Sequence, residues 1–179
     1  MKSKIFSFLV FIGIALFSAA QNLESFTATL QLNETGGHNY ISIANKKTYT
    51  QSEAKANKAA IDLALVVTPD NGKQKAEWYN MSGKDSKIPA ELLGTATLIN
   101  TISLDREQFD QCKTSQDLKR MTGHITNNSL SHFASVGDSV ETGVTYHCFI
   151  VQLGNGKRVL MWLDAVDART FKVMVKAQA

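Results

Sequence analysis

The C-terminal part of the chain holds its most constraining pattern, two long apolar segments around a glycine-rich turn. Residues 144–153 (VTYHCFIVQL) and 157–164 (KRVLMWLD) are rich in β-branched and aromatic side chains, and they flank residues 154–156 (GNG). Asn-Gly between two such segments is typical of a two-residue hairpin loop. Residues 170–177 (TFKVMVKA) alternate in the same way after a short turn. The sequence therefore predicts a three-stranded antiparallel meander at this end.

The N-terminal half combines strands with one helix. Residues 26–32 and 40–44 alternate between apolar and polar side chains and predict two strands. Thr50 and Glu53 have the spacing of a capping box and open an alanine-rich helix. The apolar, β-branched residues 61–68 that follow predict a buried strand, which the turn-forming residues after it should end.

The middle of the chain has shorter signals. Residues 98–103 predict a strand, and residues 105–112 and 114–121 predict short helices that begin at an aspartate and a threonine. Residues 72–87 are polar and predict a loop, and residues 123–139 predict an irregular segment. Taken together, the pattern predicts an α+β fold, mainly an antiparallel sheet with a few short helices packed on it.

The first 20 residues are typical of an export signal. Lys2 and Lys4 precede an apolar run at residues 5–17, and small residues follow at residues 18–20. The run is shorter than the roughly 20 apolar residues that span a membrane. We expect cleavage after residue 20, which leaves residues 21–179 as a single domain in the periplasm or outside the cell. No membrane span is expected after cleavage.

The charge balance argues against a nucleic-acid partner. The chain has 19 basic residues, including Lys2 and Lys4, so 17 remain after cleavage against 16 acidic residues. Nucleic-acid binding needs a basic face that neutralises phosphates, and the sequence has no clustered run of Lys and Arg.

Two segments resemble a family of uncharacterised exported proteins of the Bacteroidetes. Residues 40–66 (YISIANKKTYTQSEAKANKAAIDLALV) are similar to its strand, T-G-K-x-Y-[ST] turn, helix and I-D-[LF] strand, although the turn here lacks the glycine. Residues 153–178 are similar to its N-G-K-x-G-L ending, with Val159 in place of the glycine. The resemblance implies an exported bacterial protein. It also makes Ser139 a candidate O-glycosylation site, because residues 138–140 (DSV) are similar to the D-[ST]-[apolar] site of that phylum.

Asp62 interrupts the apolar run after the predicted helix. A carboxylate at a helix C-terminus is disfavoured by the helix dipole, and an unpaired charge in an apolar segment is costly. Asp62 therefore needs a partner. The structural interpretation is an ion pair or bonds to backbone amides of a neighbouring turn, and it is favoured over a ligand or metal carboxylate.

Cys112 and Cys148 have two interpretations. The expected export permits a disulfide between them, since the bacterial periplasm is oxidising. Alternatively, both are buried free thiols. The second interpretation is slightly favoured, because Cys148 lies in the middle of a predicted core strand, where a cysteine acts as a small apolar residue.

The predicted C-terminal hairpin also brings together a candidate ligand site. With residues 155 and 156 as the loop, His147 lies opposite Asp164, and Phe149 lies beside Trp162 on the same face. Aromatic and polar groups in such an arrangement suit a glycan or an apolar ligand. Trp78 is a further candidate, as an aromatic anchor in the predicted loop. The alternative is that helices bury this face of the sheet.

The sequence favours a binding module over an enzyme. It lacks a phosphate-binding loop, a dinucleotide fingerprint and a metal-ligand spacing among its histidines, so no cofactor or metal is predicted. We expect an exported protein that binds a glycan or a protein. The alternative is a small secreted hydrolase that uses His147 with Asp164, or a cysteine.

Overall fold

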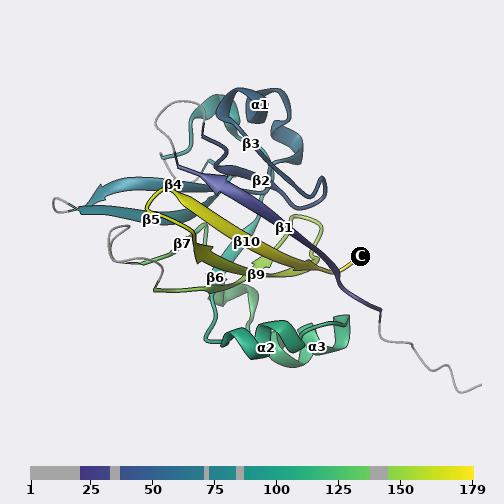
Figure 1. Cartoon of the computed structure of the whole chain (residues 1–179). Helices are drawn as coiled ribbons and strands as arrows, with labels where there is room; N and C mark the ends of the chain where they lie inside the picture. The colour runs from purple at the N-terminus through teal and green to yellow at the C-terminus, as the bar shows by residue number, and fades with distance from the viewer. Residues whose placement is uncertain (1–20, 33–36, 71–72, 84–86, 138–144) are drawn as a thin grey trace, which may run out of the picture.

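Two five-stranded antiparallel sheets form the fold in a computed structural model that describes residues 21–32, 37–70, 73–83, 87–137 and 145–179 (Figure 1). The first sheet has the order β1-β10-β9-β8-β6, and the second has the order β3-β2-β4-β5-β7. The strands are β1 (Glu24–Gln31), β2 (Tyr40–Ser42), β3 (Lys47–Tyr49), β4 (Leu63–Asp70), β5 (Lys73–Asn80), β6 (Leu98–Thr101), β7 (Phe133–Ser135), β8 (Cys148–Gln152), β9 (Arg158–Ala165) and β10 (Thr170–Ala177).

Short helices connect and cover these sheets. They are α1 (Gln51–Ala56), α2 (Arg106–Gln111) and α3 (Ser115–Thr122), with 3-10 turns η1 (Lys58–Ala60), η2 (Ala90–Leu92) and η3 (Asn127–Ser129). Each α-helix begins with a capping box, led by Thr50, Asp105 and Thr114 respectively. The cap satisfies backbone N–H groups that have no partner inside the helix, which stabilises helices this short. The predicted capping box at Thr50 is confirmed.

The elements form four layers, with helices outside and the two sheets inside (Figure 1). The facing sides of the sheets share one apolar cluster that includes Leu65, Trp78, Phe149 and Met161. α2 and α3 cover the other face of the first sheet, and α1 with η2 covers the other face of the second. The α+β class and the C-terminal meander are confirmed, but the strands divide into two sheets.

Both faces of β9 are buried because it lies inside this layered arrangement. Val159, Met161 and Leu163 face the second sheet, whereas Leu160 and Trp162 face α2 and α3. This explains why its sequence is a nearly continuous apolar run. A strand that faced water on one side would alternate with polar residues.

The predicted register of the β8–β9 hairpin is wrong by one residue. Gln152 pairs with Arg158, and the Leu153 N–H donates to the Lys157 carbonyl at 2.9 Å, so the loop has three residues, 154–156. Gly156 has a φ of +83°, which is typical of the left-handed residue in three-residue loops. A shift of one residue in the register changes every cross-strand pair in the hairpin. Cys148 therefore pairs with Trp162 instead of Leu163.

β5 is a second difference from the sequence prediction. It pairs with all of β4, from Leu63 opposite Asn80 to Asp70 opposite Lys73, where a loop was predicted. The polar sequence did not indicate a strand, because it contains a charged residue, Glu77, that is nevertheless buried. Two lysines balance the charge of its carboxylate. Lys75 and Lys87 each place their ammonium group 3.1 Å from its carboxylate. Residues 123–139, predicted as irregular, likewise contain β7.

Candidate functional site

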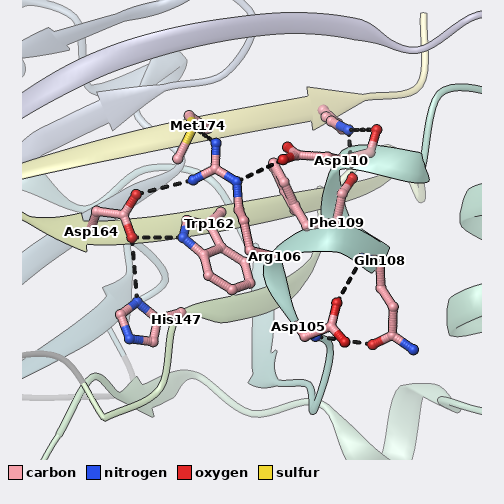
Figure 2. Close-up of polar contacts among 10 residues, drawn as sticks. Asp105, Arg106, Gln108, Phe109, Asp110, His147, Trp162, Asp164 and Met174 are labelled. Atoms are coloured by element: carbon pink, nitrogen blue, oxygen red, sulfur yellow. Dashed lines mark hydrogen bonds and ion pairs between the residues drawn. The ribbon is translucent and has the colours of Figure 1, made fainter.

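A polar cluster lies on the α2-covered side of the first sheet and centres on Asp164 (Figure 2). We call Arg106, His147, Trp162 and Asp164 the Asp164 cluster. Trp162 and Asp164 are two residues apart in β9 and project to the same face. His147 immediately precedes β8, and Arg106 is the first residue of α2. The fold thus joins three separate elements around one carboxylate.

The Asp164 carboxylate has a partner on each oxygen. Oδ1 accepts a hydrogen bond from Trp162 Nε1 at 2.7 Å and lies 3.5 Å from His147 Nδ1. Oδ2 accepts a charge-assisted hydrogen bond from the Arg106 guanidinium at 3.2 Å. The side chain of Asp164 nevertheless remains 39% exposed. Its carboxylate can therefore orient the surrounding groups and still be reached from solvent.

The His147 ring has a defined orientation and tautomer. Nδ1 lies 2.8 Å from the Leu163 carbonyl oxygen, which can only accept a hydrogen bond, so Nδ1 carries the proton. In the neutral imidazole, Nε2 is then the acceptor. Figure 2 shows this second nitrogen turned away from Asp164. An acceptor on a side chain that is 40% exposed is available to a ligand.

The Trp162 indole is enclosed by its neighbours. The His147 ring stacks on it, with centroids 5.2 Å apart and planes 18° apart. Phe109 packs against it with centroids 5.7 Å apart, and the Arg106 guanidinium lies 5.6 Å from the indole centroid. Trp162 is therefore only 7% exposed. Its ring supports the site from below and is not itself a face on which a ligand can stack.

Arg106 was not predicted as a site residue. It bonds Asp110 within α2 at 3.0 Å and reaches Asp164 in β9 and the Met174 sulfur in β10. A basic residue in the first helical turn is disfavoured by the helix dipole. The unfavourable position of this charge was thus a sign in the sequence that Arg106 has a partner elsewhere. The position of Asp62 gave a sign of the same kind. Phe109 was also missed, and its burial follows from its position on the inner face of α2.

The structure brings together only part of the predicted ligand site. His147, Asp164 and Trp162 are in contact, although His147 lies opposite Leu163 in the hairpin instead of opposite Asp164. Phe149 and Trp78 are wrong as surface candidates, because both are fully buried between the sheets. They contact each other there, edge to face, with centroids 6.3 Å apart. The register of the hairpin is the reason, since Phe149 pairs with Met161 and turns away from Trp162.

Both cysteines are buried free thiols in the structure. They lie in the apolar cluster under α2 and α3. Burial raises the pKa of the Cys148 thiol to about 12, and burial also raises the pKa of Cys112. A nucleophilic cysteine requires the thiolate and access to substrate. Neither condition holds for these residues.

Asp62 has the backbone partner that the structural interpretation requires. Its Oδ2 accepts a hydrogen bond from the Ile43 N–H at 2.8 Å, and its own N–H donates to the Ile41 carbonyl. The side chain is buried, and this burial raises its pKa to about 6, although the bond from Ile43 opposes the shift. Asp62 thus holds the end of β2 against the start of β4.

The remaining predicted features concern modification, metals and the membrane. Ser139 lies outside the described residues. Within the described part of the chain, no group of three His, Cys, Asp or Glu side chains is placed to hold a metal ion. No helix in that same part is long and apolar enough to cross a membrane.

Comparisons with known proteins identify the fold. No protein-family model and no curated protein matches the sequence. A crystal structure of a DUF4466 family protein from Parabacteroides merdae matches with a TM-score of 0.63 at 15% sequence identity. The match covers 87% of this chain and 53% of that protein, so this chain spans about half of its length. The source is a member of the Bacteroidetes, the phylum to which the sequence resemblance points. The chain thus shares its α+β fold with part of an uncharacterised protein from the Bacteroidetes.

Proposed function

We propose that the chain is an exported binding module and that its ligand contacts the Asp164 cluster. The observation that carries this proposal is the convergence of three half-exposed polar side chains, Arg106, His147 and Asp164, above a buried aromatic base. Such a base fixes the polar groups in position before a ligand arrives, which lowers the entropic cost of binding. The signal-like first 20 residues support export.

The chemistry of the cluster favours a glycan. His147 Nε2 offers an acceptor, the Arg106 guanidinium offers donors, and the Asp164 carboxylate can accept further hydrogen bonds. Sugar hydroxyls donate and accept at once, so they match a surface that presents both functions. A shallow depression along α2, lined by Arg106, Glu107, Asp110, Gln111 and Lys113, shares Arg106 with the cluster. A protein ligand is the second candidate for the same surface.

The hydrolase alternative has less support. His147 and Asp164 are adjacent, but in the described residues no hydroxyl or thiol is hydrogen-bonded to the imidazole. Nucleophilic catalysis needs such a group within reach of the base. Cys112 and Cys148 are buried, so neither can supply it.

Calorimetric titration of the purified protein with two sets of oligosaccharides, neutral and uronate-containing, tests the binding proposal. We expect saturable binding of at least one set, and we expect His147→Ala and Arg106→Gln to weaken it about tenfold or more. Arg120→Gln on α3 is the matched control, because Arg120 is exposed and, among the described residues, bonds only Asp117. Absence of binding, or equal loss in the control, contradicts the glycan proposal and directs the search to protein ligands.

Export has its own test. We expect expression in a Bacteroidetes host to yield a protein whose N-terminal residue is Gln21, recovered outside the cytoplasm. Recovery of the uncleaved chain in the cytoplasm contradicts export without bearing on ligand binding.

A further inference from the structure

β1 forms one edge of the first sheet. It pairs with β10 along all eight of its residues, from Glu24 opposite Ala177 to Gln31 opposite Thr170. The sheet order places β10 on one side of β1 and no strand of that sheet on the other. β3 of the second sheet lies beside part of that outer side, where the Thr48 hydroxyl donates to the Thr29 carbonyl, so the sheet can grow only along the rest of it.

Alternate residues of β1 direct their backbone groups to that outer side. The Leu32 N–H donates to the Arg169 carbonyl, so even-numbered residues face β10 and odd-numbered residues face outward. Two outward groups have partners: the Thr29 carbonyl accepts from the Thr48 hydroxyl, and the Gln31 N–H donates to the His38 carbonyl. Within the described residues, the outward backbone groups of Thr27 have no partner.

The sequence of β1 does not protect this edge. Apart from Glu24 at its start, β1 contains no charged residue and no proline, the two features with which natural edge strands avoid pairing. The opposite edge of the sheet is different. There, the Ile99 backbone of β6 exchanges two hydrogen bonds with Ser131, each of 2.9 Å. Of the two edges of the first sheet, the one at β1 is thus the less protected.

A groove of about 470 Å³ follows the outer side of β1. The β2–β3 hairpin forms its far wall, beside β1 on the side away from β10 (Figure 1). The charged residues that line the groove, Lys46 and Lys47, are both basic. Lys46 is paired with Glu24, but both side chains are about half exposed, at 48% and 51%, so this pair is open to a competing carboxylate.

We propose that this groove binds an acidic polypeptide segment in extended conformation, which adds to the first sheet as a strand beside β1. Main-chain hydrogen bonds to Thr27 supply affinity in this mode of recognition, and side chains supply specificity. Acidic side chains of the segment contact Lys46 and Lys47. This surface is formed by β1 and β3, so the proposal is independent of the Asp164 cluster.

Calorimetry with three seven-residue peptides tests the proposal. The first alternates threonine and valine and carries two glutamates, the second has lysines in place of the glutamates, and the third is the acidic peptide with N-methyl groups on alternate amides. We expect saturable binding of the acidic peptide only. Amide exchange of Thr27, measured by NMR, should slow when that peptide binds.

Two variants separate the contributions of backbone and charge. Thr27→Pro removes the outward N–H and leaves the pairing with β10 intact, since proline is tolerated on edge strands. It should abolish binding. Lys46→Glu combined with Lys47→Glu keeps the backbone and should weaken binding about tenfold. Lys119→Glu, a single charge reversal on the exposed side of α3, is the control and should change little.

Three results overturn the proposal. These are no binding of the acidic peptide at millimolar concentration, equal binding of the lysine peptide, and equal binding of the N-methylated peptide. Sedimentation of the protein alone identifies a different occupant. A dimer that Thr27→Pro dissociates, without peptide binding, assigns the edge to a second copy of this chain.

Discussion

The imidazole of His147 covers the indole of Trp162, with their ring planes only 18° apart. The aromatic ring that the sequence offered as a ligand platform is therefore the base of the site, and the histidine is its surface. The exposed chemistry of the cluster is that of an imidazole, a guanidinium and a carboxylate.

Removal of the His147 ring should expose Trp162. We expect His147→Ala to shift tryptophan emission to longer wavelength and to increase quenching by acrylamide. Trp78 is fully buried and contributes a constant background. Tyr146→Ala is the matched control, because Tyr146 is adjacent and exposed but does not cover the indole. Unchanged quenching in His147→Ala would contradict the stacking.

Asp62 should make stability fall as pH rises. Its pKa is about 6 in the folded protein and 3.8 ordinarily, so the native state binds more protons than the unfolded state between those values. The free energy of unfolding should therefore decrease by about 2–3 kcal/mol from pH 4 to pH 7, relative to Asp62→Asn. Urea unfolding at several pH values measures this difference. The exposed Asp110→Asn is the control and should follow the wild type. A wild-type curve parallel to that of Asp62→Asn would be inconsistent with the raised pKa.

Gly94 should not tolerate a side chain. Its N–H donates to the Met81 carbonyl at 2.7 Å, and a Cβ atom at this position would lie 2.2 Å from the Lys58 carbonyl oxygen. That atom belongs to the backbone and cannot move aside. We expect Gly94→Ala to lower the free energy of unfolding by about 1–3 kcal/mol in urea denaturation. Gly154→Ala, whose Cβ would lie 3.4 Å from the nearest atom, should cost far less. Equal losses would argue against the close approach.

The two thiols should be unreactive until the protein unfolds. Burial raises the pKa of both, so neither thiolate nor access is available at neutral pH. We expect maleimide to label neither cysteine in the native protein and both after denaturation without reductant. Cys112→Ala and Cys148→Ala assign the labels. A requirement for reductant would reveal a disulfide, and rapid native labelling of one thiol would revive a cysteine nucleophile.

Local signals in the sequence predicted much of this fold, and contacts between distant segments account for the differences. Capping boxes depend on residues three apart, so the start of each helix could be predicted. The β8–β9 register depends on whether Gly154 belongs to the loop. Because it does, Phe149 lies in the core and not in the site where it was predicted. Arg106 reaches Asp164 from 58 residues away, a contact that no local pattern contains.

β1 and β10 are neighbours in the first sheet but lie near opposite ends of the described chain. Among the described strands, β1 emerges first during synthesis and its partner β10 emerges last. Its partner is absent throughout that interval, and pairing over such a separation then also requires closure of a long loop. The order of synthesis therefore makes the joining of β1 to β10 a late step, and the unprotected SFTATLQ segment is exposed to other chains until that step is complete.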